Sequence, residues 1–312
     1  MSNNDILLSV AVITYNQEKT ISKTLDSILE QEHDYPYEII IGDDCSVDGT
    51  KSIIEDYVLR YPKIVKAIYN KKNMGLIKNY YNVISNCSGK YIMECAGDDW
   101  WLPGKVKTQI EFMESHNDVG MCYGKAMCYN SKNECMNIFK GVMCDNFYEV
   151  LEQNPVPAVT VCFKNNLMHQ YICDVMPITR DWKMEDYPIW LWFYKNSKVS
   201  YLSTPLACYK YSNESVSNTK NIEKQISFLK STYDIRNFYA AKYGGQIKKF
   251  EDDETAKFLI FCQLLNSYDR EKAQKMRNVL LKEHTLKNII KSLMISNNFF
   301  AYIGKIIVKY YG

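Results

Sequence analysis

The sequence predicts an α/β fold over its first two thirds and a helical segment after it. Short apolar runs rich in β-branched residues recur along the amino-terminal part, and such runs are typical of strands buried on both faces of a sheet. Helically spaced apolar residues separate the runs, and no convincing strand follows residue 219. The predicted strands occupy residues 6–13, 37–42, 64–69, 90–95 and 119–123.

Between these strands, apolar residues recur three or four positions apart, which is the spacing of one helix face. The apolar positions are Ile21, Leu25, Ile28 and Leu29, then Ile53, Ile54, Tyr57 and Val58, then Leu76, Tyr80, Val83 and Ile84. Alternation of strand and helix implies parallel strands joined by crossover helices. Ligands of such sheets bind beyond the carboxyl ends of the strands, so the residues that follow each strand are the first candidates for a site.

The alternation weakens after residue 125. Residues 156–163 and 199–209 are predicted as strands, and residues 185–195 as a short aromatic-rich helix that opens with acidic residues, as the helix dipole favours. Residues 212–218 form a polar stretch, and we expect a domain boundary near residue 216. From about residue 219 the chain is predicted to be helical.

Composition excludes several classes of protein. The 38 Lys and Arg residues nearly balance the 36 Asp and Glu residues, and a formal net charge of +2 gives no basic field of the kind that a nucleic-acid binder uses. Eleven cysteines without a CxxC pair argue against structural zinc and fit a reducing compartment. No run reaches the roughly 18 apolar residues of a membrane span, and the amino end lacks the basic start of a signal peptide. A cytoplasmic protein is expected.

Two acidic pairs follow predicted strands. Asp43 and Asp44 end one strand, and Asp98 and Asp99 follow another, so a common strand-end site would gather four carboxylates near Tyr15. A hard cation such as Mg²⁺ or Mn²⁺ gives these carboxylates a reason to be close. The alternative for either pair alone is ordinary turn chemistry, in which Asp caps a helix or closes an Asx turn.

Five segments form an ordered set of motifs along the chain. They are SVAVITYNQEKTISKTLDSILEQ, EIIIGDDCSVDGT, NKKNMGLIKNYYNVISNCSGKYI, ECAGDDWWLPGKVKTQIEF and, at residues 185–191, EDYPIWL. In these segments, from about Ser9 to Tyr211, the chain resembles the family 2 glycosyltransferases, inverting enzymes of the GT-A fold. That fold is a Rossmann-like mixed sheet flanked by helices. The resemblance implies a GT-A catalytic domain over 1–216, with a nucleotide-binding half at 1–124 and an acceptor half at 125–216 that carries the catalytic base, and a helical extension over 217–312.

Carried over residue by residue, the resemblance implies a nucleotide site. Tyr15 would stack on or flank the nucleobase, Asp44 would accept a hydrogen bond from it, and Asp98 would hold the ribose. Asn73 and Lys78 stand where family members place polar and basic groups near the nucleotide, although the usual Arg is absent from its customary position.

The resemblance also implies a metal site at Asp99, which would bind the Mg²⁺ or Mn²⁺ that bridges the donor diphosphate. Family members often carry another acidic residue one or two places before this pair, where this chain has Ala96 and Gly97. Some also supply a further ligand near the end of the catalytic domain, where residues 209–213 contain no His. One carboxylate, phosphate oxygens and water would then hold the cation, which magnesium chemistry permits.

The catalytic base implied by the resemblance is Asp186. An acceptor hydroxyl loses a proton as it attacks the anomeric carbon, and a carboxylate within hydrogen-bond reach can take it. The leaving nucleoside diphosphate needs no general acid, because the cation neutralises its charge. Without the resemblance, Glu185 and Asp186 would equally fit an acidic pair at a helix N-terminus.

Missing features argue against other nucleotide-handling classes. The turn after the first strand, ITYNQEKT, has no Gly and therefore no GxGxxG dinucleotide motif, and the chain has no GxxxxGKS/T phosphate loop. Two GDD tripeptides are typical of polynucleotide polymerases, but the chain lacks the basic groove that a template needs. The alternative from another class is a non-catalytic sugar-nucleotide-binding or assembly protein of a glycan pathway, although a binder needs no base at Asp186.

The carboxyl-terminal segment, residues 284–312, spaces apolar residues helically with Lys between them. Such a helix lies on an anionic membrane surface, or it packs on the catalytic domain or on a second copy of the chain, and the sequence favours neither interpretation. We therefore expect a glycosyltransferase that moves a sugar from a UDP-sugar to a glycan or lipid-linked acceptor of bacterial surface polysaccharide, such as capsule or O-antigen. It would work in the cytoplasm or on the inner face of the plasma membrane.

Overall fold

A computed structural model describes residues 6–130, 132–211, 221–266, 269–282, 286–296 and 301. The chain divides into two compact units. The first comprises Met1–Ser212 and Tyr239–Gly245, and the second comprises Asn213–Phe238 and Gln246–Gly312. The boundary expected near residue 216 lies outside the described residues, and the sequence does not predict that residues 239–245 group with the first unit.

The first unit is built on one mixed sheet. Its strands are β1 (Leu8–Thr14), β2 (Tyr37–Asp43), β3 (Val65–Tyr69), β4 (Tyr91–Ala96), β5 (Trp100–Trp101), β6 (Val119–Tyr129), β7 (Cys135–Lys140), β8 (Cys162–Lys164) and β9 (Lys198–Lys210). They are ordered β3-β2-β1-β4-β8-β6-β9-β5, and β7 pairs with β6. β1 to β4 run parallel, as the alternation predicts, whereas β8 is antiparallel to both β4 and β6.

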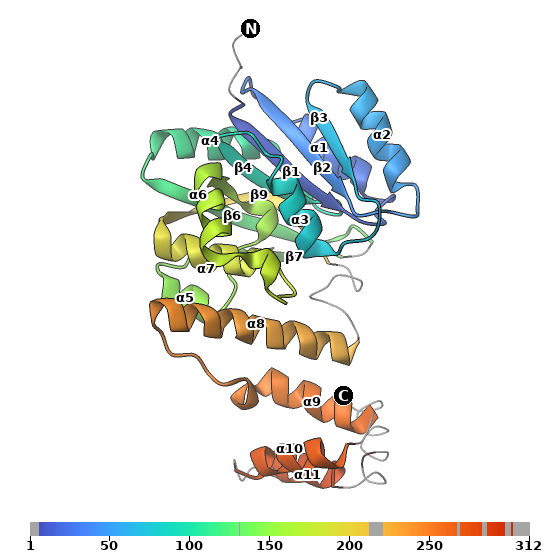
Figure 1. The fold of residues 1–312 in the computed structure, drawn as a ribbon, viewed down its shortest axis with the longest axis vertical. Coiled ribbons are helices and arrows are strands. Elements are labelled where there is room, and N and C mark those ends of the chain that lie inside the picture. Colours follow the sequence, from blue (N-terminus) through green and yellow to red (C-terminus); the bar gives the residue numbers. More distant parts are fainter. Residues whose placement is uncertain are drawn as a thin grey trace. The chain divides into compact units, whose positions relative to one another are not determined.

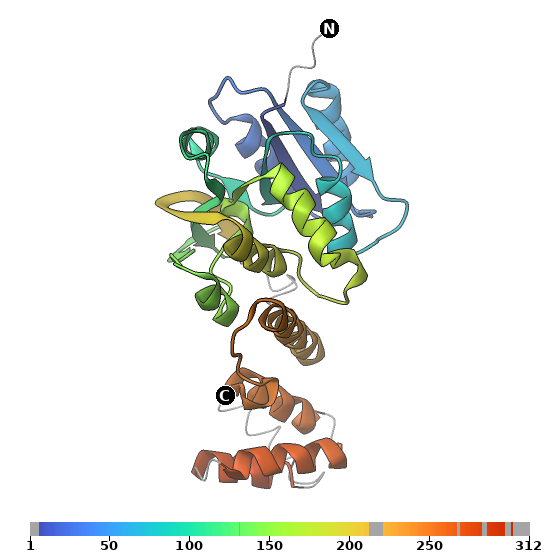
Figure 2. The ribbon, with the colours of Figure 1, turned by 60° about the vertical axis from the view of Figure 1, so that its left-hand side comes forward.

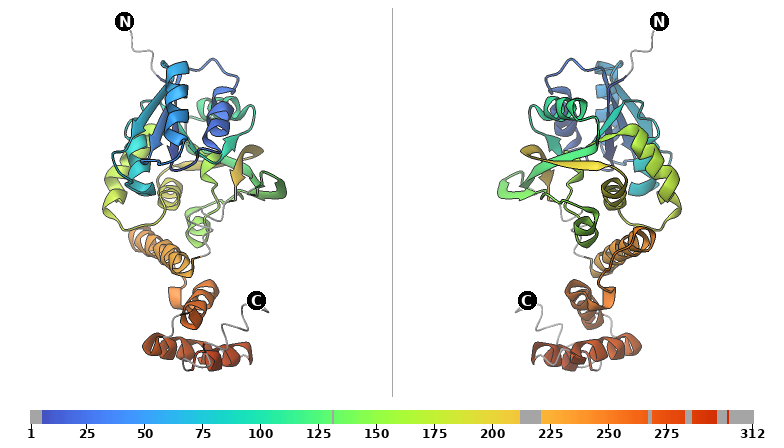
Figure 3. Two further views of the ribbon diagram at one scale, coloured as in Figure 1. Left: turned by 90° about the vertical axis from the view of Figure 1, so that its right-hand side faces the viewer. Right: turned by 90° about the vertical axis from the view of Figure 1, so that its left-hand side faces the viewer.

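Helices cover both faces of this sheet. They are α1 (Ile21–Leu29), α2 (Thr50–Arg60), α3 (Leu76–Ile84), α4 (Lys105–Ser115), α5 (Phe147–Glu152), α6 (Asn165–Val175) and α7 (Asp186–Asn196), with 3₁₀ turns η1 (Ala158–Thr160) and η2 (Pro177–Thr179). α3 and α6 lie side by side on one face (Figures 1 and 2), where the hydroxyls of Tyr81 and Tyr171 share a hydrogen bond of 3.0 Å. α1 and α4 cover the opposite face (Figure 3).

The core forms because the central strands are apolar on both faces. Val10 and Val12 of β1 and Ile41 of β2 have no exposed surface. Each such side chain contributes about 1.5–3 kcal/mol when it is buried. A one-residue slip would turn every side chain to the wrong face, so burial fixes the register that sets Thr14 opposite Asp43.

Residues 156–163 do not form the strand that the sequence predicts. Residues 158–160 form η1 instead, and the strand in this region, β8, covers only residues 162–164. Pro155 and Pro157 explain the difference, because proline lacks a backbone N–H and fixes φ, which excludes it from the middle of a sheet. The prediction over 156–163 is therefore wrong except at its last two residues.

The elements of the second unit that the structure describes are all helices, as the sequence predicts. Its elements are most of α8 (Ile222–Tyr243), η3 (Phe250–Asp252), α9 (Glu254–Asn266), α10 (Arg270–Lys282) and α11 (Leu286–Met294). Leu264 of α9 packs with Met276 and Leu280 of α10 in an apolar core of this unit. None of the described helices combines the length and the apolar character of a membrane span. Apart from α11, most of the segment 284–312 lies outside the described residues.

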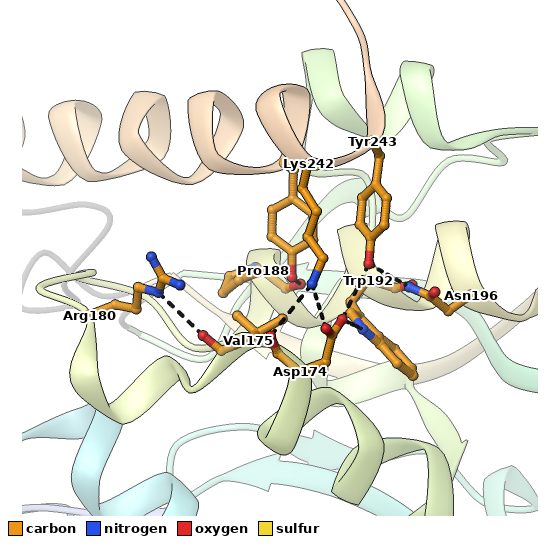
Figure 4. Close-up of polar contacts among 9 residues, drawn as sticks. Asp174, Val175, Arg180, Pro188, Trp192, Asn196, Lys242 and Tyr243 are labelled. Carbon is orange, nitrogen blue, oxygen red and sulfur yellow. Dashed lines mark hydrogen bonds and ion pairs between the residues drawn. The ribbon is translucent and has the colours of Figure 1, made fainter.

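The last turns of α8 group with the first unit and bind α7, the aromatic-rich helix that the sequence predicts (Figure 4). Trp192 Nε1 donates to Asp174 Oδ2 at 2.7 Å, and Lys242 Nζ forms a 2.6 Å ion pair with Asp174 Oδ1. The Tyr239 hydroxyl donates to the backbone carbonyl of Pro188 at 2.6 Å. These bonds fasten α7, whose first turn carries the predicted catalytic base.

Asp174→Ala is expected to lower the free energy of unfolding of the first unit by about 1–3 kcal/mol, because it leaves the buried Trp192 Nε1–H without its acceptor and breaks the ion pair to Lys242. Urea unfolding of the full chain, followed by Trp fluorescence, measures this unit, since all five Trp residues belong to it. Asp181→Ala is the matched control, because the Asp181 side chain is 94% exposed, and its effect should stay within about 0.5 kcal/mol. Equal midpoints for the two variants would contradict the anchoring role.

Candidate active site

Three loops meet at one edge of the sheet because β2, β1 and β4 are parallel neighbours. These loops carry the strand-end residues that the sequence singles out. Backbone bonds extend the pairing beyond the strands: Asp44 N donates to Thr14 O at 3.0 Å, and Gly97 N donates to Ile13 O at 2.9 Å. The edge is therefore ordered where a ligand of such a sheet is expected to bind.

Asn16 ties the loop after β1 to the loop after β2. Its backbone N–H donates to Ser46 Oγ at 2.9 Å, and its Oδ1 accepts from Val47 N at 2.9 Å. It does so with a φ of 52°, in the left-handed region that Asn tolerates better than most residues. Tyr15, one position earlier, is 45% exposed. A fixed backbone thus presents an exposed aromatic ring at this edge.

Asp44 anchors the loop between β3 and α3. Its side chain is only 3% exposed. Oδ1 accepts from Met74 N at 2.8 Å and from Asn70 Nδ2 at 2.9 Å, and Oδ2 accepts from Gly75 N at 2.8 Å. Three of the roughly four lone-pair positions of this carboxylate are occupied, which leaves at most one for the nucleobase contact that the resemblance implies.

Asn73 and Lys78 are both exposed, Asn73 in the anchored loop and Lys78 in the first turn of α3. Sequence reasoning missed Asn79, which is buried in the same helix. Its Nδ2 donates to Gly42 O at 2.9 Å, and its Oδ1 accepts from Asn70 Nδ2 at 2.9 Å. Because Asn79 binds the end of β2, the loop that carries Asn73 is held from two sides.

Asp98 and Asp99 lie in the turn after β4. Asp99 is 6% exposed, its backbone carbonyl accepts from Thr24 Oγ1 at 2.7 Å, and its Oδ1 accepts from Lys210 N at 2.9 Å. Burial, and then the charge of Asp98, raise the pKa of Asp99 well above its usual range. Burial raises the pKa of Asp98 as well. Two crowded carboxyl groups with raised pKa values would both be stabilised in their charged form by a cation.

The four strand-end carboxylates do not converge on one point, so that prediction is wrong. Asp43 accepts from the backbone N–H and the hydroxyl of Ser46, and Asp44 is occupied as described above. β2 and β4 lie on opposite sides of β1, which separates their ends by two strand spacings, about 10 Å. Across the part of the chain that the structure describes, no three His, Cys, Asp or Glu side chains form a group that could hold a metal.

Asp186 is the first residue of α7. Its Oδ1 accepts from Tyr187 N at 2.7 Å, and its Oδ2 accepts from Asn154 Nδ2 at 3.1 Å. Burial raises the pKa of Asp186, and these two hydrogen bonds oppose the rise. One oxygen thus serves the helix N-terminus, as the alternative interpretation expects, while the other is held by a side chain from a separate loop.

A small cavity of about 50 Å³ lies between the turn after β4 and the start of α7. Glu94 lines it from β4, Asp99 from the turn after β4 and Tyr80 from α3. Glu185 lines it from the position next to Asp186. The cavity therefore brings the strand-end carboxylate predicted for metal binding and the neighbour of the predicted base to one space.

Comparison with known proteins assigns the family. Residues 9–170, just over half of the chain, match the family model described as Glycosyl transferase family 2. The chain belongs to glycosyltransferase family 2. An uncharacterized protein of Mycobacterium tuberculosis is 37% identical over 117 residues, which cover 37% of this chain and 34% of that protein. The match thus spans about a third of the length of that relative.

Two further comparisons cover more of the chain. The Escherichia coli protein WfgD, a UDP-Glc:alpha-D-GlcNAc-diphosphoundecaprenol beta-1,3-glucosyltransferase, is 26% identical over 234 residues, 74% of this chain and 86% of WfgD. The structure of S. aureus TarS 1–349 in complex with UDP-GlcNAc aligns with a TM-score of 0.55 at 17% identity, over 94% of this chain and 91% of that 1–349 chain. This likeness confirms the predicted GT-A fold, a mixed sheet flanked by helices.

Glu94 lines the small cavity, and sequence reasoning missed it. It lies inside β4, where burial raises its pKa to about 8, and the Tyr80 hydroxyl donates to its carboxylate. Burial, followed by the charge of Asp186, also raises the pKa of Glu185. The sequence could have indicated Glu94, because it lies within the apolar run YIMEC and a buried carboxyl group inside a strand needs a partner.

Lys140 is a second missed residue, at the end of β7. Its ammonium nitrogen lies 3.7 Å from the ring centroid of Tyr209 and 4.6 Å from that of Tyr211. Its charge acts on both Asp99 and Asp186. No motif marks this lysine, so the sequence held no signal that could have found it.

The residues present fit a divalent cation that the substrate helps to hold. Asp99 Oδ2 accepts no hydrogen bond from the described residues, while Oδ1 is held by a backbone N–H. Burial and an adjacent carboxylate raise the pKa of Asp99. A nearby cation would lower that pKa again and stabilise the charged form. Asp99, with Asp98 beside it, would hold such an ion together with phosphate oxygens and water.

Glu94→Gln is expected to reduce the dependence of stability on pH. The pKa of Glu94 in the folded chain is about 8, above its ordinary 4.5. The stability that protonated Glu94 contributes is therefore fully present below the pKa of Glu94 in the unfolded chain. It is lost as the pH rises to the pKa of Glu94 in the folded chain. Gln keeps an acceptor for Tyr80 but does not ionise.

Urea unfolding at pH 5 and at pH 8 measures the effect. The stability difference between the two pH values should be smaller in Glu94→Gln than in the wild type. Glu111→Gln, at an exposed position of α4, should retain the wild-type difference. If Glu94→Gln also shows the wild-type difference in stability between the two pH values, the raised pKa of Glu94 is contradicted.

Proposed function

We propose that this transferase moves a sugar, with inversion, from a nucleotide-diphosphate donor to a hydroxyl of a glycan or lipid-linked acceptor of bacterial surface polysaccharide. The observation that carries the proposal is the cavity lined by both Asp99 and Glu185. It sets the strand-end loops next to the start of α7, where Asp186 lies. A donor bound at the strand-end loops and a general base at the neighbouring start of α7 are what a single displacement needs.

The relatives support a UDP-sugar donor and a lipid-linked acceptor. WfgD is named for UDP-Glc and for an acceptor on diphosphoundecaprenol, and TarS has been solved with UDP-GlcNAc. In the proposed complex, the exposed ring of Tyr15 stacks on the nucleobase, and the remaining lone pair of Asp44 accepts a hydrogen bond from it. Asp98 holds the ribose, and Asn73 and Lys78 flank the nucleotide.

Asp186 is the general base in this proposal. It takes the proton of the acceptor hydroxyl as that oxygen attacks the anomeric carbon, while the bond from this carbon to the diphosphate breaks on the opposite face. A pKa that burial raises brings the carboxylate closer to the operating pH, where general bases are most effective. Asn154 orients one oxygen of the carboxylate. The resulting displacement at a single carbon inverts its configuration.

Asp99 is the proposed protein ligand of Mg²⁺ or Mn²⁺. When bound, the cation neutralises charge on the departing diphosphate. A hard cation held by one or two carboxylates takes its remaining ligands from phosphate oxygens and water, so we expect Asp99 to bind it firmly only when the nucleotide is present.

The proposed acceptor also bears on where the transferase works. A lipid-linked glycan would be extended at the inner face of the plasma membrane, so we propose a cytoplasmic protein that acts there. Membrane contact through residues 284–312, or pairing with a second copy of the chain, belongs to the same proposal.

Asp186→Asn is expected to reduce sugar transfer by about 10²–10⁴-fold, because the amide cannot accept the proton of the acceptor. UDP affinity should stay at the wild-type value, since Asp186 contacts the acceptor side. Transfer from labelled UDP-sugars to lipid-linked acceptors gives the rate, and calorimetric titration with UDP gives the affinity. Asp181→Asn, five positions earlier and exposed, is the control that should retain both.

Three outcomes separate the hypotheses. Unchanged transfer by Asp186→Asn would rule out the base assignment. Loss of UDP affinity together with transfer would make Asp186 a binding residue instead of a base. A wild-type protein that binds nucleotide sugars but transfers none would support the non-catalytic alternative.

A further inference from the structure

The backbone around Lys140 is held in place from several sides. Lys140 pairs with Ala126 across the β6–β7 ladder. The next residue, Gly141, has a φ of 95°, and a Cβ there would come within 2.4 Å of the carbonyl oxygen of Gly124. The Tyr201 hydroxyl donates to the Gly141 carbonyl at 3.3 Å. The strand therefore delivers Lys140 to a defined position.

The ammonium group of Lys140 is held by aromatic rings. It lies over Tyr209 and Tyr211, and cation–π attraction favours this placement. Among the described residues it forms no ion pair with a carboxylate. Its positive charge nevertheless lowers the pKa of Asp99, in the turn after β4, and of Asp186, at the start of α7. Tyr209 and Tyr211 flank Lys210, whose backbone N–H donates to Asp99 Oδ1 at 2.9 Å. Lys140 thus lies over the two neighbours of a residue that is bound to Asp99.

Lys105 shows what a structurally satisfied lysine looks like in the same unit. It is fully buried, and its Nζ donates to Gln109 Oε1 at 2.5 Å and to the Val161 carbonyl at 3.4 Å. Lys140 is partly buried without comparable oxygen partners among the described residues. A desolvated cation of this kind is costly to the folded chain unless an anion approaches it.

The negative charge at this edge of the sheet also needs a cation in addition to the metal ion. Asp98, Asp99 and Asp186 are carboxylates, and the donor diphosphate adds further negative charge. One divalent ion on a single carboxylate leaves part of this charge uncompensated, and like charges at such distances repel strongly at reduced dielectric. Lys140, held over the two residues that flank the backbone partner of Asp99, offsets it.

We propose that Lys140 binds the donor diphosphate and stabilises the charge that develops on it as the sugar leaves. The inference rests on the proposed function. In this step the bond between the anomeric carbon and the β-phosphate oxygen breaks, and its electron pair stays on that oxygen. The acceptor oxygen bonds to the carbon, and its proton passes to Asp186. Lys140 keeps its own protons and donates hydrogen bonds to the phosphate.

UDP and uridine test this role, because only UDP carries the diphosphate. Lys140→Met removes the charge and keeps an unbranched side chain over the tyrosine rings. With Mn²⁺ present, the Kd for UDP is expected to rise about 10- to 100-fold, the range for losing a hydrogen bond to a charged group. The Kd for uridine should not change. Lys140→Arg should recover most of the UDP affinity.

The control is Lys125→Met, at a lysine of the adjacent strand β6, which should bind both probes as the wild type does. Thermal unfolding confirms that each variant is folded. GDP and guanosine are titrated in parallel, because the base recognised is itself part of the proposed function.

Each outcome is decisive. A Lys140→Met protein with wild-type UDP affinity overturns the diphosphate role, and so does an equal loss of UDP and uridine affinity, which would mean a displaced site. Failure of Lys140→Arg to recover affinity shows that the positive charge is not what matters, and this also overturns it. A wild type that binds neither UDP nor GDP overturns the proposed function itself, and the role of Lys140 with it.

Discussion

The candidate active site depends on the parallel pairing of β1 with β2 on one side and with β4 on the other. This pairing delivers three carboxyl ends to one edge of the sheet, and burial on both faces fixes the register. The loops at that edge bind one another: Asn16 reaches Ser46, and Asp44 holds the backbone at Gly75. These hydrogen bonds hold the loops together, and exposed residues on them, such as Tyr15, can contact a ligand.

The same edge concentrates acidic groups in a poorly hydrated place. Asp99, Glu94 and Glu185 line one cavity, and burial is the first cause of the raised pKa of each. The raised pKa values of Glu94 and Glu185 favour the neutral form of both groups, which makes their proximity tolerable. Ionisation stays unfavourable at Asp98 and Asp99, which are proposed to bind the ribose and the metal ion. Sites arranged for binding often carry such a cost until the ligand arrives.

The sequence predicts the elements that local pattern determines. Buried parallel strands appear as continuous apolar runs, and α7 appears as an aromatic helix with acidic residues at its start. β7 was not predictable, because its residues are almost all exposed and show no alternation. Contacts between residues far apart in the sequence were not predictable either. Nothing local links Asp44 to Gly75, or Lys140 to Tyr209, because sheet topology and loop packing bring these pairs together.

A crystal of the full chain soaked with UDP and Mn²⁺ tests the central claim most directly, through an anomalous difference map. The account predicts a manganese peak at bonding distance from the Asp99 carboxylate, the base against Tyr15, and the diphosphate between Asp99 and Lys140. A manganese peak remote from Asp99, or a nucleotide bound away from the carboxyl ends of β1, β2 and β4, would contradict it.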